Sequence, residues 1–256
     1  VVGLLSDPEL PVRVDAVVAL RHFIDEAEDT ESIKPILPQI LGAIFQLMGE
    51  VDAEELVFTL ETLVQKFGTD IAPYAAQMMT QLVAAFNKYM AAVDEEDDED
   101  EGTASIAAYE CLRAINTLLD SLSGLGPELY LAIEDALLPL VMKLLSTDGQ
   151  DVVEEVLEML AYLTFFGPGI TPKLWSCWPL MHAMLMDWAI DSWDLASHSL
   201  NGDYSDKEVV PAAKLLQLVL QTCRGSIDNW VGPYIGLALQ RLPRTEHNSL
   251  KDSLVQ

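Results

Sequence analysis

Apolar residues recur along this chain at the three- and four-residue spacing that places side chains on one face of an α-helix. Leu56, Leu60, Leu63, Val64 and Phe67, for example, fall on one stripe of a helix over 52–67. No segment alternates apolar and polar residues between hairpin turns, as a half-buried β-strand does. The pattern therefore predicts an all-α protein, with helices after Pro35 and over 52–67, 70–92, 104–122, 149–165 and 208–223.

Proline-containing segments recur among these helices and indicate a repeat. The stretch over 67–74, FGTDIAPY, is nearly copied over 166–173, FGPGITPK, and related signals contain Pro35 and Pro233. A proline suits the first turn of a helix, because its fixed φ fits there and its missing N–H is not needed. The spacing brackets the ~40–47 residues of HEAT-type repeats and predicts a single α-solenoid over 1–256, with about five to six antiparallel helix pairs.

The first residues carry the clearest repeat signature. Residues 4–24, LLSDPELPVRVDAVVALRHFI, resemble the HEAT consensus, with a turn at Asp7 and a second helix that contains Arg13. In that family an Asp in the turn and an Arg in the second helix commonly form a ladder from repeat to repeat, and only these two residues match it here. The chain begins and ends inside predicted helix pairs, so we expect a part of a longer array, since solenoids normally close with polar capping repeats.

The charge of the chain narrows the class of partner. The net charge is −27, and it would still be −19 without the eight carboxylates over 94–101, so the acidity belongs to the whole surface. Nucleic acid is excluded as a direct partner because its affinity comes mainly from Lys and Arg that neutralise phosphates. No run reaches the roughly 18 apolar residues of a membrane span, so no membrane insertion is expected. A basic protein partner would be attracted.

The segment over 93–103 is predicted to be an acidic loop inside one repeat, because like charges at i,i+4 disfavour a helix. One frame resembles a calcium loop, but its twelfth position is Ala108, where a bidentate Glu is needed. The two interpretations left open are a solubilising loop and a flexible arm that contacts a basic partner. The candidate residues are Asp94, Glu95, Glu96, Asp97, Asp98, Glu99, Asp100 and Glu101.

Other chemistry is missing from the sequence. The four His and three Cys do not have the spacing of zinc ligands, and no phosphate-binding loop or nucleophile motif occurs. We therefore expect no metal, no cofactor and no enzymatic activity.

The helix over 149–165 has an acidic face. Asp151, Glu154, Glu155 and Glu158 fall at i, i+3, i+4 and i+7, and no Lys or Arg occurs in this helix. Acids in a first turn complement the helix dipole, which explains Asp151 and Glu154 well and Glu158 poorly. The alternative is a surface for a basic partner. Glu54 and Glu61, seven residues apart on the helix over 52–67, are candidates for the same surface.

Four tryptophans lie between residues 175 and 193. Trp175 and Trp178, with His182 next in line, mark one face of a helix. They are interpreted either as core residues between neighbouring repeats or as part of an outer groove.

The order of the longer motifs is similar to that of the importin-beta superfamily, in the group of importins seven and eight. The motifs are LSDPELPVRVDAVVAL, then IAPYAAQMMTQLVAAFN followed by the acidic run, then ITPKLWSCWPLM, then AAKLLQLVLQTCRG. The resemblance runs over nearly the whole chain and implies a nuclear transport receptor with an armadillo-type HEAT fold. Such a receptor shuttles between cytoplasm and nucleus and carries cargo under the control of the GTPase Ran.

The resemblance also implies roles for the candidate residues. Second helices line the concave face of importin-like solenoids, so the acids named above would hold basic protein cargo. First helices form grooves for the Phe-Gly repeats of nuclear pore proteins, which is the role implied for Trp175 or Trp178. The main Ran contact of the superfamily lies in N-terminal repeats not visible here, so Ran would bind mainly through other parts. The alternative function is a passive HEAT scaffold without Ran control.

One region departs from the family pattern. Between Trp188 and Ala212 the chain is shorter than the family by roughly one helix hairpin. Residues 191–207 are therefore predicted to be a loop, or to border a hairpin that is deleted here or missing from the printed sequence.

Overall fold

The computed structural model describes residues 1–51, 53–93, 103–145, 152–187 and 217–241. These residues form α-helices and short 3₁₀-helices, and no β-strand occurs among them. The chain divides into two compact units, Val1–Leu137 and Leu138–Gln256. None of the helices in the described ranges is both long and apolar enough to cross a membrane.

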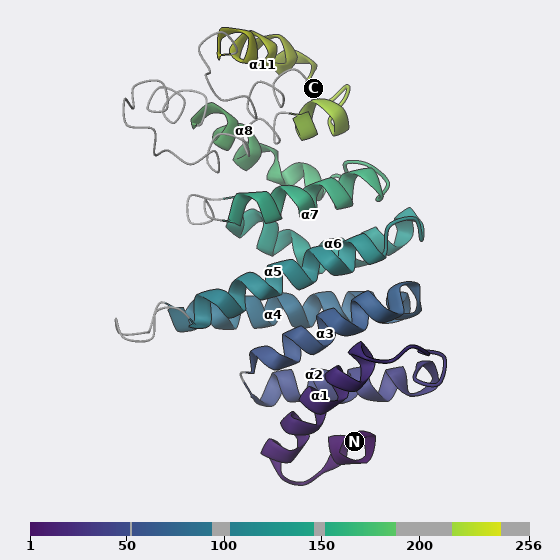
Figure 1. Ribbon diagram of the computed structural model, residues 1–256. Helices are drawn as coiled ribbons and strands as arrows, with labels where there is room; N and C mark the ends of the chain where they lie inside the picture. Colours follow the sequence, from purple (N-terminus) through teal and green to yellow (C-terminus); the bar gives the residue numbers. More distant parts are fainter. Residues whose placement is uncertain (52, 94–102, 146–151, 188–216, 242–256) are drawn as a thin grey trace. The chain divides into compact units, whose positions relative to one another are not determined.

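The first unit consists of stacked helix pairs (Figure 1). Its helices are α1 (Leu10–Asp25), α2 (Leu37–Glu50), α3 (Glu54–Phe67), α4 (Ala75–Val93), α5 (Thr103–Ser121) and the first part of α6 (Pro127–Leu144), with 3₁₀-helices η1 (Val2–Ser6), η2 (Lys34–Ile36) and η3 (Gly68–Tyr74). Helix α3 packs between α1 and α5, and α2 and α4 lie behind them as a second layer. This arrangement confirms the predicted all-α HEAT-type fold.

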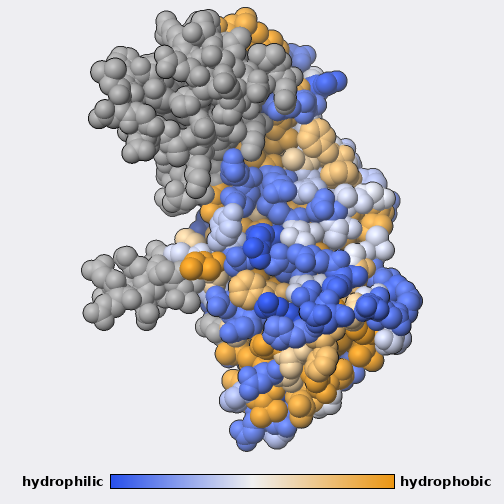
Figure 2. Space-filling model, in the orientation of Figure 1, coloured by the Kyte–Doolittle hydropathy of each residue, from blue (hydrophilic) through white to orange (hydrophobic). Residues whose placement is uncertain are grey.

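The predicted apolar stripes form the core between the layers. All five residues of the α3 stripe are buried, from Leu56 to Phe67. Ala108, Leu112, Ile115 and Leu118 of α5 are buried as well, as the helical spacing requires. Burial of one such side chain contributes about 1.5–3 kcal/mol. Hydrophilic residues gather on the visible face over α3 and α5, whereas hydrophobic residues are frequent around α1 and η1 (Figure 2).

Helix boundaries follow local signals at most ends. Gly68 ends α3 with a φ of 46°, a conformation that glycine adopts without the steric cost of a Cβ atom. Pro35, the predicted helix-starting proline, lies in the short 3₁₀-helix η2 immediately before α2, and the proline in the first turn of α2 is Pro38. The prediction for Pro233 is wrong, because its helix begins five residues earlier and the proline lies inside it.

The second unit contains the end of α6, then α7 (Val153–Phe165), the 3₁₀-helix η5 (Leu174–Cys177), α8 (Trp178–Asp187), helical residues 217–222 and α11 (Asp228–Arg241). Val156, Leu157, Leu160 and Leu163 of α7 are buried, which confirms most of the apolar stripe predicted for this helix. The loop predictions for 93–103 and 191–207 fall almost wholly outside the described residues.

Candidate functional site

Helix α7 presents its carboxylates where the sequence places them. Glu154 and Glu158 are exposed and Glu155 is half-buried. Glu154 and Glu155 lie in the first turn, where the helix dipole favours negative charge, whereas Glu158 lies one turn farther on. Asp151 lies outside the described residues. Within the described part of α7 the acidic face is therefore accessible, and its last carboxylate gains little from the helix end.

An open groove of about 480 Å³ lies beside this face. One wall is α7 and the other is the helical segment 217–222, more than fifty residues later in the chain. The residues that line the groove are Glu154, Leu157, Glu158, Ala161 and Phe165 on α7, and Gln217, Leu218 and Gln221 opposite. The buried Leu157 and Leu218 form its floor, whereas Phe165 is 54% exposed.

The α7 wall changes character along its length. Glu154, Glu158, Ala161 and Phe165 are spaced four, three and four residues apart, so they follow one another along a single face of the helix. The N-terminal half of this wall is acidic and the C-terminal half is apolar. The groove therefore offers two carboxylates and an aromatic ring to one ligand.

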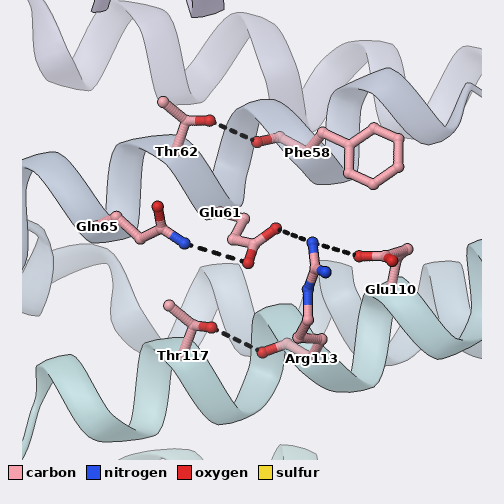
Figure 3. Close-up of polar contacts among 7 residues, drawn as sticks. All are labelled: Phe58, Glu61, Thr62, Gln65, Glu110, Arg113 and Thr117. Atoms are coloured by element: carbon pink, nitrogen blue, oxygen red, sulfur yellow. Dashed lines mark hydrogen bonds and ion pairs between the residues drawn. The ribbon is translucent and has the colours of Figure 1, made fainter. Parts of the chain in front are cut away.

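Glu61 lies in a different environment, between α3 and α5 (Figure 3). Its side chain is 11% exposed, and Arg113 of α5 donates a 2.9 Å hydrogen bond to Glu61 Oε2. Gln65 donates to the other carboxylate oxygen, and the Arg113 guanidinium also pairs with Glu110 at 2.6 Å. The hydrogen bond to Glu61 raises the pKa of Arg113, and burial opposes it. Glu61 thus contributes to helix packing, while Glu54 is half-buried at the start of α3.

Arg13, which matches the HEAT pattern, pairs with a residue other than Asp7. Its guanidinium lies 2.6 Å from the carboxylate of Glu50, the last residue of α2. The Asp7 carboxylate accepts the backbone N–H of Glu9 instead. The hydrogen bond to Glu50 raises the pKa of Arg13, and the charge of Asp7 acts in the same direction. The pair therefore joins α1 to α2 and is structural.

The tryptophans near 175 belong to an aromatic cluster of the second unit. Trp175 and Trp178 stack at 5.1 Å between ring centroids with only 4° between their planes. Trp178 is buried and also contacts His182 and, from α11, Trp230 and Tyr234. The His182 ring and the Tyr234 hydroxyl share a hydrogen bond, and burial raises the pKa of Tyr234 to about 12. Trp175 is half-buried, so it is the more accessible member of the predicted pair.

Metal ligands do not converge in the described ranges. No group of three or more His, Cys, Asp or Glu side chains within them is arranged to hold an ion. The eight carboxylates over 94–101 lie outside these ranges, so their role as an arm or as a solubilising loop stays a prediction.

Sequence reasoning did not find five of the groove residues, which are Ala161, Phe165, Gln217, Leu218 and Gln221. One signal was present, because Phe165 is an apolar residue that follows the acids at helical spacing. The two glutamines had no comparable signal, since nothing in the sequence indicates that segment 217–222 faces α7.

Comparison with known proteins identifies several that are similar in sequence to this chain. No family model matches it. The chain is 44% identical over 288 residues to an importin beta-like SAD2 homolog of Arabidopsis thaliana, which covers all of this chain and 28% of the relative. It is 28% identical to a probable importin-7 homolog of Dictyostelium discoideum, and 25% identical to Importin-8 of Mus musculus. These matches cover 98% and 94% of the chain and 26% of each relative, so the chain spans about a quarter of their length.

The matches confirm that the chain resembles the importin seven and eight group of the importin-beta superfamily over its whole length. The names of these relatives denote importins rather than enzymes, in agreement with the prediction that the chain is not an enzyme.

Proposed function

We propose that this chain, whose relatives over its whole length are importins, is a segment of a nuclear transport receptor that binds basic protein cargo. The cargo surface includes the acidic face of α7. The relatives' names support the receptor class, and the charges of the chain support the class of cargo.

The observation that carries the proposal is the acidic, solvent-accessible face of α7. Glu154 and Glu158 are exposed, Glu155 is half-buried, and the helix contains no Lys or Arg. Like charges at Glu154 and Glu158, four residues apart, cost a helix about 0.2–0.5 kcal/mol. A basic partner removes that cost and gains Coulomb energy, and the net charge of −27 steers it toward the surface.

The other partners follow from the receptor class. Ran binds mainly through parts outside this segment and releases the cargo in the nucleus. Trp175 contributes to a groove for Phe-Gly nucleoporins, and the carboxylates over 94–101 contact the basic cargo. The receptor shuttles between cytoplasm and nucleus.

Charge reversal on α7 tests the cargo surface. The variant combines Glu154→Lys, Glu155→Lys and Glu158→Lys, and the control combines Glu9→Lys, Glu26→Lys and Glu28→Lys, three exposed acids of the first unit. Binding of a lysine-rich peptide to the full chain is measured by fluorescence anisotropy at low salt. Three lost attractions predict a loss of affinity on the order of tenfold for the α7 variant and a much smaller loss for the control.

Equal losses of affinity in the two variants would show that the peptide responds to net charge alone, which contradicts a cargo surface on α7.

A second measurement tests the receptor class. Cargo captured on the full-length protein should be released by GTP-loaded Ran, whereas a passive scaffold would be indifferent to Ran.

A further inference from the structure

The groove between α7 and residues 217–222 combines features that a purely acidic surface lacks. Its α7 wall begins with Glu154 and Glu158 and ends with Phe165, a residue that is 54% exposed. An exposed aromatic ring beside a buried leucine floor favours contact with an apolar group. Two exposed carboxylates at the other end favour a cation.

The opposite wall adds a third chemistry. Gln217 and Gln221 lie four residues apart, hence one above the other on their helix. Each side-chain amide carries two donors and an acceptor. An extended peptide leaves its backbone N–H and C=O groups available to such amides, whereas a helix satisfies them internally. The glutamines therefore favour an extended segment over a helical one.

The dimensions of the groove fit a short extended segment. Glu154 and Phe165 are eleven residues apart, which corresponds to roughly 16 Å along the helix axis. About five extended residues span the same length. Residues i and i+2 of a strand lie ~6.6 Å apart on one side, close to the one-turn separation of Glu154 and Glu158.

We infer that the groove binds an extended segment of a basic protein in which two Lys or Arg residues are followed or preceded, within a few residues, by a bulky apolar side chain. The basic pair contacts Glu154 and Glu158, the apolar side chain packs on Phe165, and the glutamines contact the peptide backbone. This inference rests on the proposed cargo surface and refines it, because it adds an apolar requirement to a basic one.

Two synthetic peptides and the full chain test the apolar requirement. The first peptide carries two lysines two residues apart and, after a short flexible Gly-Ser spacer, a leucine; in the second, glycine replaces the leucine. Fluorescence anisotropy should show that the first binds the wild-type chain roughly tenfold more tightly, the effect of burying much of one leucine side chain. The substitution Phe165→Ala should remove most of this advantage and leave the affinity for the second peptide unchanged.

The matched control is Phe166→Ala, which removes a neighbouring exposed aromatic that stacks on Tyr162 and does not line the groove. It should leave both affinities unchanged. If Phe165→Ala perturbs folding, Ala161→Arg serves instead, since it places a cation in the middle of the groove. The Ala161→Arg variant should bind both peptides more weakly than the wild type, with the larger loss of affinity for the leucine peptide.

The outcomes separate this inference from the proposed function. Equal affinity of the two peptides, or a leucine advantage that survives both Phe165→Ala and Ala161→Arg, overturns the inference. If the double substitution Glu154→Gln and Glu158→Gln still lowers the affinity of the chain for both peptides in that case, the acidic cargo surface stands. If the double substitution leaves both affinities unchanged, the proposed cargo surface is wrong as well.

Discussion

The α3–α5 junction and helix α7 carry glutamates on helices of the same kind, yet the surroundings of these glutamates differ. At the junction the nearly buried Glu61 faces Arg113, which is shared with Glu110. On α7, Glu154 and Glu158 are exposed, and the helix contributes no cation. A nearly buried carboxylate that faces an arginine contributes to packing, whereas an exposed carboxylate that lines an open groove can be reached by a ligand.

The same substitution in the two regions should have very different effects on stability. Glu61→Lys places a second cation beside Arg113 at a nearly buried position and should lower the free energy of unfolding by about 3–5 kcal/mol. Glu158→Lys replaces a like-charge pair with the favourable order of Glu and Lys, so the change should stay within about 0.5 kcal/mol. Urea unfolding at pH 7 measures both. Similar shifts in the two midpoints would break the contrast.

Removing the cation should have an intermediate effect. Arg113→Met leaves the Glu61 carboxylate with the hydrogen bond from Gln65 and should cost about 1–2 kcal/mol, less than for a fully buried pair because the Arg113 side chain is 50% exposed. The loss should shrink in a Glu61→Gln background, because the residual group is then neutral. A double-mutant cycle by urea unfolding gives the coupling, and a coupling near zero would remove Glu61 as the reason for the effect.

Periodicity predicts which side chains are buried against a neighbouring layer, and this succeeded for α3 and α5. It does not predict which polar residue on the remaining face will be covered. Glu54 and Glu61 share a face in the sequence, but Glu61 is covered because Arg113, 52 residues away, comes from the adjacent helix α5. The local signal is the same for both residues, so only the tertiary contact distinguishes them.

Helix α6 was not among the predicted helices, although its apolar residues Ile133, Leu137, Leu140 and Val141 are buried. Pro139 lies inside it, and an interior proline usually ends a helix because it removes a hydrogen bond and crowds the preceding turn. Burial of the apolar residues offsets that cost here. The groove was missed for a related reason, since its second wall comes from a segment distant in sequence.

A neutral polar group, the buried hydroxyl of Tyr130 at the α5–α6 contact, also contributes to packing. Tyr130 donates a 2.8 Å hydrogen bond to the carbonyl oxygen of Leu119, and burial raises its pKa from 10.0 to about 12. Tyr130→Phe should cost about 0.5–1.5 kcal/mol at pH 7. Because the folded pKa is raised, the contribution is fully present below pH 10 and is lost as pH rises toward about 12.

Urea unfolding of the wild type and Tyr130→Phe at pH 7, 10 and 11.5 measures this effect. The phenylalanine variant should lose less stability over the alkaline range than the wild type. Parallel pH dependence of the two proteins would show that this hydroxyl is not the group responsible.

The smallest effect concerns Glu50, an exposed carboxylate that the fold matches with Arg13. The hydrogen bond from Arg13, aided by one from Gln46, lowers the pKa of Glu50 below 4.5. A lowered folded pKa means that the contribution to stability is present above pH 4.5 and is lost as pH falls through the folded value. Glu50→Gln should therefore lower the unfolding midpoint slightly at pH 7, and the difference from wild type should vanish at low pH. Glu158→Gln should have the opposite sign at pH 7, since it relieves repulsion from Glu154. A destabilising Glu158→Gln would mean that the fold uses this carboxylate as it uses Glu50, which would contradict a ligand-binding role for the acidic face of α7.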